Sequence, residues 1–271
     1  MKNILIIGPS STIAKSYINH PKNALNNILQ FSFSDPTSTI QTLQERISNE
    51  NFHSVIYFAN KKIESSNFNT QESAFINVEL PIQIAQVCQR YGSQFLVFSS
   101  TRIFDEKEPF VRRKADYSAE TEYGRQKVDL ELGVSQYNSK VLRLTKVLSK
   151  DDEVWLNWSR SITLGIQTLV YKNKYISPIF LHEVVLAIDK VLGLNDGNIF
   201  QFSRSTELSY EMLFKDFINY SSKKISKPIN INSIDFINST ETHSSLNCDA
   251  ELVDCLGNFD TQYEEFVRSF Y

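Results

Sequence analysis

The sequence predicts an α/β protein that has a doubly wound parallel sheet and a smaller C-terminal lobe. In its first half, apolar strand-like runs alternate with segments of helical periodicity, which is the pattern of right-handed βαβ units. After about residue 150 the alternation loosens, without repeats or a Pro- or Gly-rich linker. We therefore expect residues 1–150 to form the sheet domain, to which residues 175–193 return, and residues 151–271 to form the lobe.

Five segments are predicted to form the parallel sheet. Residues 3–8 are a continuous apolar run that ends in glycine, as expected of a strand that helices cover on both faces. The other predicted strands are residues 28–33, 54–59, 94–99 and 140–145. A later strand is expected at residues 197–202.

Helices are expected between these strands. The hydroxyl side chains at residues 10–12 can cap a helix that runs to about residue 18. Further helical segments are predicted at residues 39–47, 70–91, 122–137, 181–193 and 208–220.

Composition excludes several classes of protein. The 271 residues are 41% hydrophobic and 22% charged, which is ordinary for a globular protein. A net charge of −3 gives no electrostatic footprint for nucleic acid or an anionic membrane. No apolar run approaches the roughly 20 residues that span a bilayer, and the N-terminus lacks the features of a signal peptide. The three cysteines have no metal-ligand spacing. We expect a cytoplasmic protein with reduced thiols and no metal.

The turn after the first strand, Gly8-Pro-Ser-Ser-Thr-Ile-Ala14, fits a dinucleotide site. A strand, turn and helix in this order point amide N–H groups at a pyrophosphate in the Rossmann fold. The usual pattern is Gly-x-x-Gly-x-x-Gly, and here Ser11 and Ala14 stand at the second and third positions. A plain connection without a ligand fits equally well. The cofactor contacts expected from this turn are Gly8, Ser10, Ser11, Thr12 and Ile13.

The pyrophosphate is expected over Ser11 and Thr12. A bulky residue at Gly8 is expected to abolish cofactor binding and to leave the fold intact.

The choice between NAD and NADP stays open. A carboxylate at the end of the second strand would hold the ribose 2′-hydroxyl of NAD, whereas a basic residue suits NADP. Asp35 is the candidate, although it lies late for this role, and Ser32 and Ser34 suit either cofactor. At the end of the third strand, Phe58 and Ala59 are expected to contact the cofactor.

Tyr123 and Lys127 give the strongest chemical signal. Residues four apart on a helix share a face, and a nearby ammonium favours the phenolate, which brings the pKa of the phenol toward neutrality. The same spacing occurs at Tyr57/Lys61 and Tyr220/Lys224. Only the Tyr123 pair opens a predicted helix that follows a strand ending in hydroxyl residues. We therefore expect the other two pairs to be surface residues.

Phe98-Ser-Ser-Thr-Arg-Ile-Phe104, followed by Tyr123-Gly-Arg-Gln-Lys127, resembles the catalytic core of extended short-chain dehydrogenases/reductases that act on sugar nucleotides. These belong to the NAD-dependent epimerase/dehydratase family. Asn77 stands where this family has an Asn on its long central helix, and residues 177–185 resemble its Pro-containing return to the sheet. Residues 245–257 resemble the C-terminal segment of dTDP-4-dehydrorhamnose reductases. The likeness covers most of the chain and is weak over residues 151–175.

The resemblance implies a division of labour. Tyr123 would exchange a proton with the sugar while hydride passes to or from the nicotinamide. Lys127 would tune Tyr123 and hold the nicotinamide ribose, and Ser100 would hydrogen-bond the reacting oxygen. The remaining implied site residues are Asn77 for the cofactor, and Thr101 and Arg102 for the substrate.

The leading hypothesis is an NAD(P)-dependent reductase of a nucleotide-linked 4-keto sugar, in surface-polysaccharide or deoxysugar biosynthesis. The alternatives are an epimerase or dehydratase of the same superfamily, or a non-catalytic NAD(P)-sensing protein. The set of Ser100, Tyr123 and Lys127 argues against the sensor. Thr101 and Arg102 follow Ser100 and neither is a carboxylate, so a dehydratase would lack an evident acid or base. The sugar, the nucleotide and a homodimeric state stay open.

Three further residues carry structural expectations. Arg143 lies in a strand pattern and is expected to join a buried ion pair. Trp155 and Trp158 are expected either to contact a nucleotide base or to form the core of the lobe.

Overall fold

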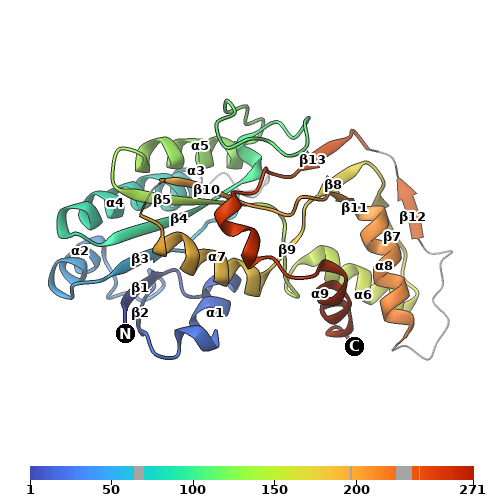
Figure 1. Cartoon of the computed structure of the whole chain (residues 1–271), viewed down its shortest axis with the longest axis horizontal. Helices are drawn as coiled ribbons and strands as arrows, with labels where there is room; N and C mark the ends of the chain where they lie inside the picture. The colour runs from blue at the N-terminus through green and yellow to red at the C-terminus, as the bar shows by residue number, and fades with distance from the viewer. Residues whose placement is uncertain (64–69, 196, 224–233, 238) are drawn as a thin grey trace.

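The computed structural model describes residues 1–63, 70–195, 197–223, 234–237 and 239–271. Within these residues a parallel sheet has the strand order β10-β5-β4-β3-β1-β2, which confirms the predicted doubly wound fold (Figure 1). Its strands are β1 (Asn3–Ile7), β2 (Asn27–Phe31), β3 (Ser54–Tyr57), β4 (Gln94–Ser100), β5 (Ser139–Leu144) and β10 (Ile199–Phe202).

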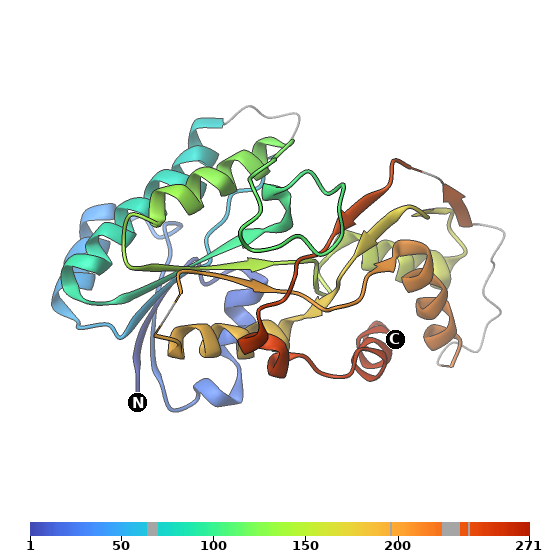
Figure 2. The same cartoon turned by 45° about the horizontal axis from the view of Figure 1, so that its top comes forward.

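Helices cover both faces of this sheet (Figures 1 and 2). One face packs against α1 (Thr12–Ile18), α7 (Leu181–Gly193) and the 3-10 helix η5 (Ala250–Cys255). The other packs against α2 (Ile40–Asn49), α4 (Leu80–Tyr91) and α5 (Glu122–Val134).

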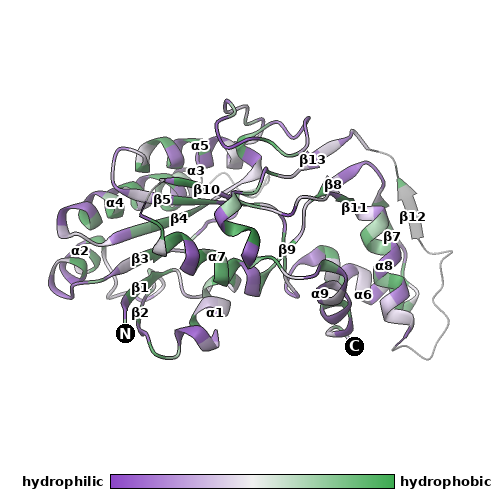
Figure 3. Ribbon diagram, in the orientation of Figure 1, coloured by the Kyte–Doolittle hydropathy of each residue, from purple (hydrophilic) through white to green (hydrophobic). Residues whose placement is uncertain are grey.

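The strands are apolar along their whole length because each face has its own core. In β1, Ile4 and Ile6 pack with α1 and α7, whereas Leu5 and Ile7 pack with α2 and α4. Successive side chains of a strand point to opposite faces, so both sets are buried. Hydrophobic residues accordingly follow the central strands in Figure 3.

The segment predicted as one helix over residues 70–91 is interrupted. It consists of α3 (Thr70–Ala74), a π-helical turn η2 (Phe75–Glu79) and α4. Pro81 in the first turn of α4 has no N–H group, so the carbonyl of Asn77 lacks its α-helical donor. The backbone N–H of Leu80 instead donates to the carbonyl of Phe75, in the wider π pattern.

The lobe combines short strands with three helices of the described chain, α6 (Glu153–Leu164), α8 (Tyr210–Ser222) and α9 (Phe259–Arg268). Trp155 and Trp158 are both almost fully buried, with their rings edge to face at 4.7 Å. The lobe's strands are β7 (Thr168–Tyr171), β8 (Lys174–Ile176), β11 (Leu208–Ser209), β12 (Ile234–Ile237) and β13 (Thr242–Ser244). Two short strands, β6 (Val147–Leu148) and β9 (Ile179–Phe180), pair where the chain passes between sheet and lobe.

More of the C-terminal half belongs to the sheet domain than the predicted residues 175–193. Strand β10 pairs with β5, and η5 packs on α7. The predicted strand at residues 197–202 is thus an edge strand of the main sheet. The C-terminal part of the chain therefore contributes to both halves of the molecule.

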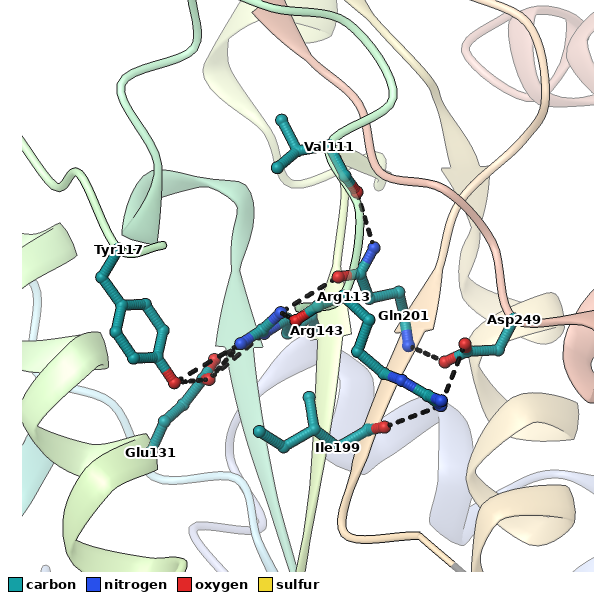
Figure 4. A network of polar contacts seen from close by, with 8 residues as sticks. All are labelled: Val111, Arg113, Tyr117, Glu131, Arg143, Ile199, Gln201 and Asp249. Atoms are coloured by element: carbon teal, nitrogen blue, oxygen red, sulfur yellow. Dashed lines mark hydrogen bonds and ion pairs between the residues drawn. The ribbon is translucent and has the colours of Figure 1, made fainter. Parts of the chain in front are cut away.

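A buried ion pair joins α5 to the sheet (Figure 4). Arg143 on β5 and Glu131 on α5 are 2.7 Å apart, and their side chains are 1% and 0% exposed. The guanidinium also donates to the side chain of Gln201 and to the carbonyl of Arg113, and the Tyr117 hydroxyl donates to Glu131. The predicted ion-pair role of Arg143 is confirmed.

The same network holds two long connections in place (Figure 4). Gln201 on β10 donates through its side-chain amide to the carbonyl of Val111, at 2.9 Å, and through its backbone N–H to Asp249. Arg113 forms an ion pair with Asp249 at 3.1 Å. The segment between β4 and α5 is therefore fixed to both the sheet and the C-terminal segment.

Candidate active site

Two cavities share one wall at the carboxyl ends of the strands. The smaller cavity, of about 350 Å³, lies at the ends of β1, β3 and β4. The larger cavity, of about 1200 Å³, lies between the sheet domain and the lobe. Both are lined by Ser100, Tyr123, Thr145 and Val147. Ligands in the two cavities would meet at these residues.

Ser100 and Tyr123 reach this wall through a close packing contact. Ser100 ends β4, and its hydroxyl oxygen accepts a hydrogen bond from the N–H of Arg102 in the 3-10 turn η3 (Thr101–Ile103). A Cβ atom added at Gly124 would lie 2.0 Å from the carbonyl oxygen of Arg102. Only glycine allows the first turn of α5 to pack on this turn, and Tyr123 lies directly before it.

The phenol of Tyr123 is tuned by burial and by Arg102. Burial raises its pKa above the ordinary value, and a hydrogen bond with Ser100 and the positive charge of Arg102 oppose this rise. The Lys127 ammonium lies over the face of the Tyr123 ring, 5.5 Å from its centroid, and donates to the carbonyl of Phe98 at 3.1 Å. That Lys127 lowers the pKa of Tyr123 stays a prediction.

Lys127 itself is buried on the smaller cavity's side of the wall. Burial lowers the pKa of its amine to about 8, against the opposing effect of the Glu131 carboxylate. A substantial fraction of the amine is neutral at mildly alkaline pH. At neutral pH the amine is still mostly protonated, so Lys127 can donate hydrogen bonds into the smaller cavity.

Most of the predicted cofactor contacts line the smaller cavity. These are Ser11, Thr12, Ile13, Phe58, Ala59, Asn77 and Lys127. Asn77 shapes the wall, because its side chain exchanges two hydrogen bonds with the backbone of Lys61 and donates a third to Gln126. Gly8, Ser10 and Asp35 do not line this cavity.

Gly8 is required by the fold. Its φ angle is +80°, and an added Cβ would lie 2.5 Å from the backbone nitrogen of Ala59. A bulky residue would therefore force β1 and β3 apart. The expectation that such a substitution leaves the fold intact was wrong.

Ser11 explains why the second glycine of the usual pattern is dispensable here. Its φ angle of −66° is ordinary for an L-residue, and its side chain caps α1 by accepting from the N–H of Ala14 at 3.1 Å. Ala14 is fully buried, as close helix–strand packing requires. Thr12, the next residue, donates to Asp151 at 3.3 Å.

Asp35 lies away from the other predicted residues. Strand β2 ends at Phe31, and the exposed Asp35 carboxylate accepts hydrogen bonds from the backbone and hydroxyl of Thr37. These bonds lower the pKa of Asp35. The structure does not bring it into the smaller cavity.

Tyr57 is a buried residue, contrary to expectation. It is 3% exposed, and its hydroxyl donates to the carbonyl of Ile76 at 2.6 Å. Tyr220 packs against Tyr263 in the lobe, and Lys224 lies outside the described residues. Tyr57 lines the smaller cavity as Tyr123 does, but its hydroxyl is bound to the Ile76 carbonyl, and Tyr220 lines neither cavity.

Thr101 and Arg102, which are predicted to contact the substrate, line the larger cavity together with charged residues that the sequence did not predict. These are Glu106, Lys146, Arg160 and Lys174. The Glu106 carboxylate accepts from Arg102 at 2.5 Å and from the Thr101 hydroxyl at 3.4 Å. The wall beside Ser100 thus does contain a carboxylate, which corrects the inference drawn from Thr101 and Arg102 alone.

Glu106 could not have been found from its spacing. It has a φ angle of +57°, which non-glycine residues seldom adopt. Strand β13 also lies against Glu106, because the His243 N–H donates to the Glu106 carbonyl. Both features arise from tertiary packing and leave no local sequence pattern.

Neither a metal site nor a membrane span is found in the described parts of the chain. No group of three His, Cys, Asp or Glu side chains there could hold a metal ion. No helix there is long and apolar enough to cross a bilayer.

Comparison with known proteins identifies relatives of this fold. A family profile described as "RmlD substrate binding domain" matches residues 3–163, and no curated protein sequence matches. The dTDP-4-dehydrorhamnose reductase of Bacillus anthracis, solved in complex with NADP, superposes with a TM-score of 0.83 at 15% identity, covering 100% of this chain and 98% of that chain.

Two other solved structures are similar. The dTDP-4-dehydrorhamnose reductase of Clostridium acetobutylicum has a TM-score of 0.81 at 12% identity, covering 99% of this chain and 98% of that chain. The Bordetella bronchiseptica enzyme WbmG, in complex with NAD, has a TM-score of 0.82 at 14% identity, covering 100% and 94%. At these identities the likenesses establish the fold.

Gly124→Ala tests the packing contact that places Tyr123. The added methyl group must displace α5 from the Arg102 carbonyl, so the free energy of unfolding should fall by about 1–3 kcal/mol, the usual cost of overpacking. Urea denaturation measures this change. The matched control is Gly193→Ala at the end of α7, where nothing lies within 4 Å of the added atom. If both variants lost the same free energy of unfolding, or if neither lost any, the contact would be contradicted.

Proposed function

The chain belongs to the RmlD substrate binding domain family, and on this premise we propose that it is an NAD(P)-dependent reductase of a nucleotide-linked 4-keto sugar. The observation that carries the proposal is the wall shared by the two cavities. One reactant in each cavity would meet the other at Ser100 and Tyr123. A hydroxyl and a phenol at that point suit proton transfer to a carbonyl oxygen.

The smaller cavity fits a nicotinamide dinucleotide. It lies where the strand order reverses between β1 and β3, the usual ligand crevice of doubly wound sheets. Two buried hydroxyls in its wall, Ser99 and Thr145, have no hydrogen-bond partner within the described chain, and a polar ligand would supply one. Ser11, Thr12 and Ile13 would contact the pyrophosphate, and the Lys127 amine would donate to the nicotinamide ribose. When bound, the cofactor supplies the hydride.

The larger cavity fits a nucleotide sugar. Its lining contains four basic side chains and a single acidic one among the described residues. Lys146, Arg160 and Lys174 can bind a diphosphate through charge-assisted hydrogen bonds. Aromatic rings of Tyr171 and Tyr175 lie in the same lining, where a nucleotide base could stack. Charge and shape therefore favour an anionic substrate with an aromatic group.

The protonation state of Tyr123 favours reduction. Burial raises the pKa of this phenol, so it is protonated at neutral pH and can act as the acid. Ser100 would hydrogen-bond the carbonyl oxygen as the proton is transferred. The Tyr123 proton would end on the product hydroxyl.

The alternative is a redox-neutral epimerase or dehydratase, which Glu106 favours because such reactions need an acid or base beside the sugar. Both carboxylate oxygens of Glu106 already accept hydrogen bonds from Arg102 and Thr101. Neither oxygen is therefore free to take a proton from a bound sugar, so the reductase remains the better proposal.

Net reduction is tested by mixing the protein with a nucleotide-linked 4-keto-6-deoxy sugar and NADPH or NADH. The absorbance of the reduced nicotinamide should fall in proportion to the alcohol formed. The control omits the sugar and should show no change. Turnover of the sugar with retained cofactor and no net change in absorbance would establish the redox-neutral alternative.

Tyr123→Phe tests the proposed acid. The variant loses the proton donor and little volume, so turnover should fall by roughly 10²–10⁴-fold, while calorimetry shows unchanged cofactor affinity. Tyr220→Phe is the control, because it removes a phenol of the same sequence spacing from the lobe. Comparable losses in the two variants would remove Tyr123 from the mechanism.

A further inference from the structure

Strand β13 joins the lobe to the turn that follows β4. Its Ser244 hydroxyl shares a 2.8 Å hydrogen bond with the Thr101 hydroxyl. The backbone N–H of His243, the residue before Ser244, donates to the Glu106 carbonyl at 2.7 Å. Ser244, Thr101 and Glu106 all line the larger cavity. The position of β13 therefore determines how this part of the cavity wall is held.

The side chain of His243 lies between two carboxylates. Its Nδ1 atom is 2.8 Å from Glu207, which precedes β11, and its Nε2 atom is 3.1 Å from Glu241, which precedes β13. An ionised carboxylate only accepts hydrogen bonds, and a neutral imidazole has a single N–H group. Only the imidazolium form, which has two donors, therefore satisfies both contacts at once.

Glu207 depends on this imidazolium to compensate its charge. The side chains of His243 and Glu207 are 15% and 10% exposed. The second carboxylate oxygen of Glu207, Oε1, is buried and has no hydrogen-bond partner within the described chain. A carboxylate removed from water is costly unless a cation pairs with it. Glu241 is 62% exposed, so water can solvate it, and Glu207 is the partner that most needs the charge of His243.

The neighbouring strand β8 also favours the cationic form. The His243 ring stacks on the ring of Tyr175, with centroids 5.2 Å apart and an interplanar angle of 9°, and an aromatic face attracts a cation. The charged group of Lys174 is directed elsewhere, because its Nζ atom lies 4.1 Å from the centroid of the Tyr171 ring. Glu106 approaches His243 through its carbonyl, whereas its carboxylate accepts hydrogen bonds within the cavity wall.

The charge of His243 changes with pH in a definite direction. Burial lowers the pKa of His243, but the hydrogen bonds and charges of Glu207 and Glu241 outweigh burial and raise the pKa above its ordinary value. A raised folded-state pKa means that the stabilisation is complete below the unfolded-state pKa and is lost as pH rises through the folded-state pKa. Above that pH one carboxylate loses its donor, and the backbone pairing of β13 with β8 has to hold the strand without it.

We propose that His243, in its imidazolium form, is a positioning residue of the larger cavity. Paired with Glu207, it holds β13 against the lobe, and β13 in turn holds Thr101 and Glu106 in the cavity wall. A nucleotide sugar then binds most tightly while His243 is protonated, and its affinity falls when the imidazolium gives a proton to the solvent. The inference rests on the proposed function for the identity of this ligand.

The test without ligand is an NMR titration of the imidazole C–H resonances. The chain has four histidines, and the resonance of His243 is the one absent from His243→Gln. In Glu207→Gln the midpoint of His243 should fall by about one pH unit, because a nearby opposite charge is lost while Glu241 remains. At neutral pH the His243 backbone N–H, which donates to Glu106, should also exchange with deuterium faster in this variant. An unchanged midpoint, or unchanged exchange, would overturn the proposal.

Glu211→Gln is the matched control. It removes another carboxylate of the lobe, whose partner is Lys215 on the same helix. The midpoint of His243 and the exchange of its N–H should both equal those of the wild type. Changes as large as those of Glu207→Gln would mean that the net charge of the lobe is responsible, which would also overturn the proposal.

Binding is measured by calorimetry with UDP-glucose and dTDP-glucose, whose diphosphate groups neither gain nor lose a proton across the neutral range. The affinity of the wild type should fall by about fivefold from the acidic to the alkaline side of the His243 midpoint, at the low end for coupled sites. His243→Gln should bind with the weaker affinity on both sides. A variant that keeps the wild-type pH dependence would overturn the inference.

Failure of the proposed function would look different. If the wild type binds neither nucleotide sugar at any pH, the larger cavity is not a site for them, and the midpoint and exchange measurements decide the positioning role of His243 by themselves. Circular dichroism establishes that each variant is folded over the pH range of the titration.

Discussion

The close approach of α5 to the carbonyl oxygen of Arg102, at Gly124, is the contact on which the site depends. It places Tyr123 beside Ser100 and brings the turn after β4 against the start of the helix. Two turns further along α5, the buried Glu131–Arg143 pair fixes the same helix to β5. Removing one partner of a buried ion pair costs about 3–5 kcal/mol, so the helix is held firmly at both points.

This contact matters for the chemistry because Tyr123, the residue before Gly124, lines both cavities. A parallel sheet delivers the ends of β1, β3 and β4 to one edge, and the lobe closes the space above them. Their shared wall is short and is formed by residues from β4, the start of α5 and the segment after β5. A reaction between ligands in the two cavities can occur only there. Burial raises the pKa of the Tyr123 phenol, so the phenol stays protonated at neutral pH.

The sequence could predict what depends on local pattern. Apolar runs and helical periodicity located the sheet strands, and position after a strand singled out Tyr123 and Ser100. Asp35 was misplaced because β2 ends four residues before it. Glu106 and the orientation of Lys127 could not be predicted, because a left-handed backbone conformation and a hydrogen bond to the Phe98 carbonyl arise from tertiary packing. The burial of Tyr57 depends likewise on the neighbouring η2 turn.

The account's central claim is that a dinucleotide and a nucleotide sugar meet at the wall formed by Ser100 and Tyr123. A crystal structure of the protein with NADP and a nucleoside diphosphate measures this most directly. The account predicts the pyrophosphate of NADP against Ser11 to Ile13, the nicotinamide ring beside Tyr123, and the diphosphate in the larger cavity. A dinucleotide bound in the larger cavity, or a nicotinamide ring away from Tyr123, would contradict it.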